Sequence, residues 1–452
     1  MEDSKTYRTG IIEKDDGNLV FFEQGFDFHF MLSDYRPFSS DNSHTLEATN
    51  SGFVYGTTHD NYSIAIFIGD TNKPVYGKQT VQTYMYLLTP GNMMPYPRNR
   101  EILYDGIVFT GKTLKRVFYP HAFVSHPTEE GQIVSYQDDT MVYHFEVDGV
   151  QYTLRVNSDA TQGTRNYGIY MINENVRLQL TFSEQQTAAD IKKHYDCICT
   201  LLSFMTFRSR IDFEKVSLLK YNPQYPGNYE REWDLYIKTP PESCEKTQID
   251  CLTFDDLGDS VQNLLKIIYS CRERQPSYSL DFIPETDEDV FLVDGNSIKA
   301  TCSGLECEMN FCEIQQSEES ERIHVLANQV KELIRQHRAS PSPLKEKSYN
   351  KIFSDIRHWG MATADNIITL YHQHQMAMAI ICSRIGAEVT DDDIENFIKY
   401  RNDITHGSYR VNNLRISQTS YVLECLVYCC LLARIGISEA KIEELCRDKV
   451  GR

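Results

Sequence analysis

Residues 391–410 read DDDIENFIKYRNDITHGSYR, and this stretch decides how the C-terminal part of the chain is expected to fold. The spacing of its apolar residues predicts an amphipathic helix. Thr390 is a suitable N-cap, and the three aspartates after it lie where the helix dipole favours negative charge. Gly407 is a natural residue to end the helix. The segment is therefore expected to be one well-delimited helix of an α-helical domain.

Three polar residues stand near the end of this helix. Its predicted apolar stripe consists of Ile394, Phe397, Ile398 and Ile404. Arg401 lies four residues after Phe397 and so falls on the same stripe, where an arginine is costly unless it has an anionic partner. Asn402 and His406 are four residues apart and share an adjoining face. Arg401, Asn402 and His406 are thus expected to lie together.

These residue types suit chemistry on a phosphodiester. Arginine offers a planar fork to phosphate oxygens, and histidine transfers protons near neutral pH. Asparagine orients an imidazole or hydrogen-bonds a phosphate. No carboxylate cluster or Cys/His knuckle accompanies them, so no metal or other cofactor is expected. The alternative is structural: R-N-x-x-x-H is a short pattern, and an arginine and a histidine at a helix end are commonly capping or surface groups.

The rest of the chain predicts an α+β multidomain protein. Short aromatic and apolar runs in residues 1–180 predict strands, with hairpins at VDGV (147–150) and IGDTNK (68–73). This favours a β-rich sandwich or barrel-like region with added helices, followed by a C-terminal all-α bundle. The expected divisions are a β-rich domain at 1–205, a mixed α/β region at 206–315 that is either separate or part of the N-terminal domain, and a helical domain at 316–452. The segment DVFLVDGNSIKATCSGLECEMNFCE (289–313) is ambiguous between strands and loop.

Composition limits the compartment and the partners. Among 452 residues there are 13 cysteines without scaffold-like spacing, and the N-terminus lacks the apolar core of a signal peptide. A cytoplasmic protein with reduced thiols and no membrane association is expected. The formal charge is −19, yet the 18 Lys+Arg and 18 Asp+Glu from residue 316 onward cancel. The acidic excess lies in residues 1–315, which are therefore not expected to hold nucleic acid by charge.

Other motifs are expected to be structural. Gly106–Thr113 (GIVFTGKT) matches the P-loop pattern by letter, but its β-favouring interior predicts two strands around a turn, with no helix after it. Nucleotide binding through Lys112 remains a minor alternative. Cys302, Cys307 and Cys312 recur every five residues, which is not zinc-knuckle spacing, although the sequence leaves metal binding there open. His372 and His374 are expected on different helix faces, and Cys425 and Cys429 in the core.

The motif YRNDITHG (400–407), near the penultimate helix of a small C-terminal bundle, resembles the R-x(4–6)-H motif of HEPN domains, whose common form also has Asn after the Arg. A β-rich region before such a bundle resembles the ApeA family of bacterial anti-phage proteins. The resemblance implies a metal-independent endoribonuclease that arrests infected cells by cleaving host RNA, such as tRNA. The 2′-OH would attack, leaving 2′,3′-cyclic phosphate and 5′-OH ends. Arg401 and His406 would be the catalytic pair, with Asn402 in support.

The resemblance also implies partners. HEPN nucleases use two copies of the motif across a dimer interface, so the stripe carrying Arg401 would face a second protomer. Lys399, Arg410 and Arg415 flank the motif and are the predicted contacts to the RNA backbone. The acidic N-terminal region would sense a trigger, such as one derived from phage, or inhibit the nuclease. The rival interpretation is a non-catalytic protein whose helices dimerise and whose aromatic-rich sheet binds a ligand.

Overall fold

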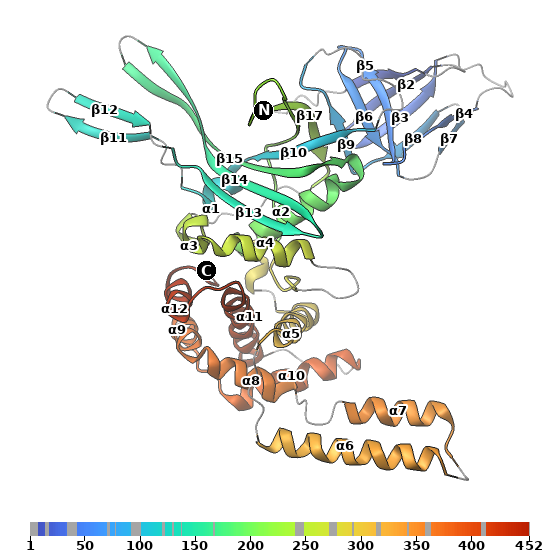
Figure 1. The fold of residues 1–452 in the computed structure, drawn as a ribbon, viewed down its shortest axis with the longest axis vertical. Coiled ribbons are helices and arrows are strands. Elements are labelled where there is room, and N and C mark those ends of the chain that lie inside the picture. Colours follow the sequence, from blue (N-terminus) through green and yellow to red (C-terminus); the bar gives the residue numbers. More distant parts are fainter. Residues whose placement is uncertain are drawn as a thin grey trace. The chain divides into compact units, whose positions relative to one another are not determined.

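The computed structural model divides the chain into two compact units (Figure 1). We call Met1–Gln248 with Thr253–Tyr269 the sheet unit, and Ile249–Leu252 with Ser270–Arg452 the helical unit. The structure describes residues 8–13, 18–33, 43–69, 73–76, 78–91, 101–119, 123–128, 131–136, 138–165, 168–239, 248–270, 278–291, 293–312, 318–340, 343–357, 363–407 and 413–451. The α+β class, with a large antiparallel sheet followed by helices, is confirmed.

The sheet unit is built on one hydrogen-bonded sheet with thirteen strands among the described residues, in the order β13-β14-β15-β10-β16-β17-β9-β6-β5-β1-β2-β3-β8. These strands are β1 (Arg8–Ile12), β2 (Leu19–Gln24), β3 (Asp27–Leu32), β5 (Phe53–Thr58), β6 (Ser63–Phe67), β8 (Lys78–Gln82), β9 (Met85–Leu88), β10 (Leu103–Thr110), β13 (Met141–Val147), β14 (Val150–Arg165), β15 (Gly168–Thr187), β16 (Lys215–Tyr221) and β17 (Tyr229–Ile237). Two smaller ribbons pair β4 (Ser43–Leu46) with β7 (Lys73–Tyr76) and β11 (Phe123–Thr128) with β12 (Gly131–Tyr136).

Side-chain alternation explains the sheet. In β2 and β3 every second residue is buried, and Phe21, Phe28 and Phe30 are fully inaccessible in one core. The hairpin expected at VDGV joins β13 to β14, and Asp148 and Gly149 both have positive φ, as a tight primed turn requires. The hairpin expected at IGDTNK is wrong. β6 pairs with β5 and β9, whereas β7 pairs with β4.

Helices cover part of this sheet. They are α1 (Lys112–Val117), α2 (Ile191–Thr206), α3 (Phe254–Leu257) and α4 (Ser260–Ser270). His194 of α2 is fully buried, with its ring centroid 4.5 Å from that of Phe182 on β15 and its Nδ1 3.2 Å from the hydroxyl of Tyr269 on α4. Burial lowers the pKa of His194 to about 3, so the imidazole is neutral in this core.

The helical unit contains α5 (Gly295–Met309), α6 (Glu318–Arg338), α7 (Glu346–Arg357), α8 (Thr363–Gln373), α9 (Gln375–Ile385), α10 (Asp391–Thr405), α11 (Leu414–Arg434) and α12 (Glu439–Asp448). Helix α11 packs against α5, α9 and α10. Among the described residues it is the one helix long and apolar enough to span a membrane, yet 72% of that window is buried inside the unit. This is the behaviour of a core helix.

The middle region 206–315 is shared between the two units. Strands β16 and β17 and helices α3 and α4 belong to the sheet unit, whereas α5 belongs to the helical unit. The ambiguous segment 289–313 is mainly helix α5, capped by Asp294, whose side chain accepts from the amides of Asn296 and Ser297. Its buried face packs on α11, and this tertiary contact favours a helix over a weak local pattern.

Candidate functional site

Helix α10 begins and ends where its sequence predicts. Thr390 caps it: the Thr390 hydroxyl accepts from the amide of Asp393, and the Asp393 carboxylate accepts from the amide of Thr390 at 2.8 Å. The chain leaves the helix at His406, the C-cap residue, and Gly407 has the positive φ that completes the turn. His406 therefore has a fixed position at the C-terminal end of α10.

The apolar stripe of α10 packs inside the helical unit. Ile394 and Phe397 are fully buried and Ile398 is nearly so. Helices α5, α8 and α11 of the same chain contact α10. Most of the stripe is therefore covered within one chain, whereas its end at Arg401 and Ile404 is only half-buried, and contact with a second protomer there stays a prediction. The chain covers most of the stripe itself because α5, which the sequence left unassigned, supplies one of the packing surfaces.

Arg401 has the anionic partner that its position requires. Its Nη2 donates to Glu306 Oε1 of α5 at 2.9 Å, and its Nη1 donates to Asn402 Oδ1 at 3.2 Å. The Arg401 side chain is 27% exposed and that of Glu306 is 42% exposed. Within the described residues the buried Arg401 Nε has no acceptor. The guanidinium thus lies at the edge of the core, and part of its donor capacity is unused.

Glu306 was not foreseen as part of this site. Two sequence features point to a helix here. Asp294 is a suitable N-cap, and Ile298, Cys302 and Leu305 are spaced to lie on one helical face, which is buried in the structure. The neighbouring thiol is not a reactive group, because burial raises the pKa of Cys302 to about 12. The polar groups available at this end of α10 are therefore those of Arg401 and the residues beside it.

Asn402 and His406 are both exposed on the last turn of α10. The backbone amide of His406 donates to the carbonyl of Asn402 at 3.0 Å. Among the described residues the His406 side chain has no hydrogen-bond partner, so its imidazole is open to solvent. The structure therefore presents a guanidinium, a carboxamide and an imidazole at one helix end, as the sequence predicts. Such a set can bind an anion and move a proton beside it.

The three cationic residues predicted to contact RNA do not all lie at the C-terminal end of α10. Lys399 is exposed on α10. Arg415 forms a two-point ion pair with Asp393, with Arg415 Nε 2.6 Å from Asp393 Oδ1. Asp393 lies in the first turn of α10, so roughly 15 Å of helix separates this pair from the last turn. Arg410 lies outside the described residues.

Cysteine and histidine residues do not assemble a metal site in the described part of the chain. Cys302 and Cys307 are buried on α5, and Cys312 follows that helix. His372 pairs with Asp391 at 2.9 Å, whereas the buried His374 lies 3.3 Å from Glu439 of α12. Cys425 and Cys429 are in the core of α11, as expected.

The P-loop-like motif has a different local structure from the one expected. Gly106–Thr110 lie in strand β10, as predicted, and their amides form the ladders to β15 and β16. The prediction of no following helix is wrong, because α1 begins at Lys112. Its residues Leu114 and Val117 are fully buried, and this burial stabilises a six-residue helix. The glycine-rich segment is extended and forms no loop around a phosphate.

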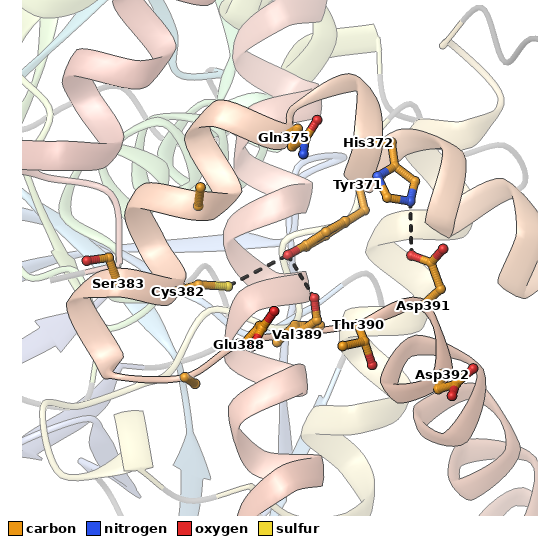
Figure 2. Close-up of a pocket in the computed structure, with 12 residues that line it drawn as sticks. Tyr371, His372, Gln375, Cys382, Ser383, Glu388, Val389, Thr390, Asp391 and Asp392 are labelled. Carbon is orange, nitrogen blue, oxygen red and sulfur yellow. Dashed lines mark hydrogen bonds and ion pairs between the residues drawn. The ribbon is translucent and has the colours of Figure 1, made fainter.

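A hollow of about 660 Å³ lies at the opposite end of α10 (Figure 2). Helices α8 and α9 and the segment leading into α10 line it. The hydroxyl of Tyr371 donates to the carbonyl of Val389 at 3.2 Å, and His372 and Asp391 pair across one side. Glu388, Asp391 and Asp392 make the hollow acidic. It is therefore unsuited to a phosphate chain.

Comparisons with protein families, curated proteins and solved structures gave no match to this chain. The assignment of a function consequently rests on the chemistry and placement of the residues.

Proposed function

We propose that the helical unit is a metal-independent endoribonuclease of the HEPN type, acting in the cytoplasm as an abortive-infection defence that cleaves host RNA such as tRNA. One observation carries the proposal: Arg401, in contact with Asn402, and the exposed His406 stand on the last turns of one helix, where both phosphate binding and proton transfer are available. The R-N-x-x-x-H spacing and its place in a C-terminal bundle support it.

The proposed reaction uses the RNA's own nucleophile. The 2′-OH attacks the adjacent phosphorus and loses its proton to a base, while the 5′-oxygen leaves and takes up a proton. The products are a 2′,3′-cyclic phosphate and a 5′-OH. Arg401 neutralises charge on the phosphorane through its fork, and His406 transfers a proton. Asn402 orients the Arg401 guanidinium through the 3.2 Å hydrogen bond.

Phosphate binding competes with an existing contact. In the free protein, Glu306 accepts a hydrogen bond from one guanidinium nitrogen of Arg401. An incoming phosphate offers a pair of oxygens to the guanidinium, as a carboxylate does. Substrate binding therefore displaces Glu306 from the guanidinium. Two protomers, each presenting the exposed Asn402 and His406, complete the proposed site as a homodimer. The sheet unit supplies sensing or inhibition.

The test is cleavage of total tRNA by purified protein in the presence of EDTA. His406→Ala and Arg401→Ala are each expected to lower the cleavage rate by at least about 100-fold, the usual scale for losing a proton-transfer or charge-stabilising group. His372→Ala and Arg335→Ala remove exposed residues of the same types elsewhere in the helical unit and serve as matched controls. Equal activity in all four variants would contradict the assignment.

A further inference from the structure

A small hollow in the sheet unit is lined by aromatic rings and carboxylates. Its volume is about 400 Å³, and it lies where the start of β16, the end of β17, helix α2 and the β2–β3 turn meet. The rings are those of Phe26, Tyr195, Phe213 and Tyr236. The carboxylates are those of Asp212, Glu214 and Asp234, and the ammonium group of Lys215 also belongs to the lining. The ribonuclease proposal uses none of these residues.

The aromatic walls are held in place by other rings. The Phe213 centroid lies 4.8 Å from that of Phe109 and 5.6 Å from that of Tyr195. On the other side, Tyr236 stacks on Tyr86 at 4.7 Å with an interplanar angle of 10°. The Phe26 ring lies 5.6 Å from the same tyrosine. The hollow is therefore formed before a ligand binds, and binding costs little free energy for ordering side chains.

Two of the three carboxylates have no cationic partner among the described residues. Asp234 is already neutralised, because Arg231 Nε donates to its Oδ1 at 2.5 Å and Lys215 Nζ lies 3.9 Å from its Oδ2. Asp212 Oδ1 accepts only from the Phe213 amide and the Thr239 hydroxyl, both neutral donors.

Within the described residues neither Asp212 nor the exposed Glu214 has a cationic partner. Residues 1–315, which include this hollow, carry 46 of the 64 acidic residues and only 27 of the 45 basic ones. The lining itself has three carboxylates and one ammonium group, that of Lys215, so the hollow keeps an acidic balance that attracts cations and repels anions.

The adjoining aromatic cluster already holds one cation. The guanidinium carbon of Arg8 lies 4.9 Å from the Tyr236 centroid and 5.7 Å from that of Tyr86. Aromatic faces attract guanidinium and ammonium groups through the ring quadrupole. The Arg8 side chain is half-buried and also lies 3.8 Å from the carboxylate of Glu23, so the rings and this carboxylate together stabilise a positive charge next to the hollow.

We propose that this hollow binds a small organic cation, an amine or guanidine carried on an apolar body. The apolar body packs against Phe26 and Phe213, and the cationic group lies at Asp212 and Glu214. Apolar walls with a few convergent polar groups are the usual composition of a small-molecule site. The site is independent of the ribonuclease proposal and stands if that proposal fails.

Three indole probes that differ in charge test this on the full-length protein. Isothermal titration is expected to detect tryptamine, with a positive charge. Neutral tryptophol should bind roughly tenfold more weakly because it lacks the cationic interaction. Anionic indole-3-acetate should give no binding. Equal affinity for the three probes, or no heat from tryptamine at millimolar concentration, overturns the proposal.

A matched pair of variants locates the site. Glu214→Gln removes one exposed negative charge at the hollow and is expected to weaken tryptamine binding several-fold. Glu146→Gln makes the same change at an exposed position on β13, which does not line the hollow, and should leave the affinity unchanged. If the two variants weaken binding equally, the effect comes from overall charge and the assigned site is wrong.

Discussion

At the scale of single residues, Arg401 shows how one contact serves both packing and the proposed chemistry. A half-buried guanidinium needs an acceptor, and Glu306 supplies one at 2.9 Å. Because both side chains remain partly exposed, the ion pair contributes at most about 1 kcal/mol to stability. Its main effect is on the orientation of the guanidinium, and orientation is what phosphate recognition requires.

The pair gives a prediction for Glu306→Gln. Removing the competing charge should lower the dissociation constant for RNA by about 2- to 10-fold, since phosphate no longer displaces a carboxylate. Fluorescence anisotropy in the His406→Ala background measures binding without cleavage. The matched control is Glu332→Gln, which removes an exposed glutamate paired with Arg335 on α6. Weaker RNA binding by Glu306→Gln would show that Glu306 positions Arg401 for RNA and does not compete with it.

The sequence alone predicts that Arg401 needs an anionic partner, but not which residue provides it. Glu306 is 95 residues away from Arg401 in the chain, on a segment without a clear helical or strand pattern. The prediction that the stripe of α10 faces a second protomer has the same cause, because the sequence does not identify residues 295–309 as a helix. Once α5 is a helix, most of the stripe of α10 is covered within one chain.

At the scale of elements, α10 is the helix whose bounds local chemistry determines best. Thr390, the aspartates after it and Gly407 are short-range signals, and the structure has the predicted start and end. By contrast, α1 and α5 depend on contacts distant in sequence. Helix α1 forms because Leu114 and Val117 are buried against β15 and α2. Local helix propensity does not predict this burial.

The cap of α10 makes a second prediction. Asp393 accepts from Thr390 and from Arg415, and the hydrogen bond from Arg415 lowers the pKa of this carboxyl to about 2. A depressed carboxyl pKa adds stability above the unfolded pKa near 4, and this stability is lost as pH falls towards 2. At neutral pH, Asp393→Asn should therefore destabilise α10 by about 1–2 kcal/mol.

Hydrogen exchange of α10 amides measures this loss directly. Asp392→Asn is the matched control, because Asp392 is exposed in the same first turn. Asp392→Asn should lower the opening free energy of the α10 amides by only about 0.3 kcal/mol, the usual size of one interaction with the helix dipole. Equal protection in the two variants would mean that the Thr390–Asp393–Arg415 contacts do not hold the helix end.

At the scale of the whole molecule, the two units should respond oppositely to pH. In the sheet unit His194 is neutral and its pKa is lowered by burial to about 3. The unfolded chain binds a proton near pH 6.5 and the folded unit does not, so the stability of the sheet unit falls as pH drops below about 6.5. His194→Gln should flatten this dependence of stability on pH. Hydrogen-exchange protection of α2, measured between pH 7 and 5, tests it.

In the helical unit the sign is reversed. Burial raises the pKa of Glu424 on α11 to about 7, and its Oε1 lies 3.3 Å from both Thr301 Oγ1 and Ser420 Oγ. The folded unit therefore keeps a proton on Glu424 that the unfolded chain loses, and stability falls as pH rises from about 4.5 to 7, by at most ~1.4 kcal/mol per pH unit for this residue. Burial also raises the pKa of Glu308 on α5 to about 7. Glu424→Gln should therefore remove the part of the slope that Glu424 contributes and leave the part from Glu308. Parallel pH dependence of the two units would contradict both assignments.

The measurement that tests the ribonuclease proposal most directly is the chemistry of RNA ends in cells that express the protein. Sequencing of 2′,3′-cyclic phosphate and 5′-OH ends is expected to reveal new, paired sites with the wild type and none with His406→Ala. The His372→Ala control should give the wild-type pattern. Identical RNA ends with wild type and His406→Ala, or ends carrying a 5′-phosphate, would contradict the account.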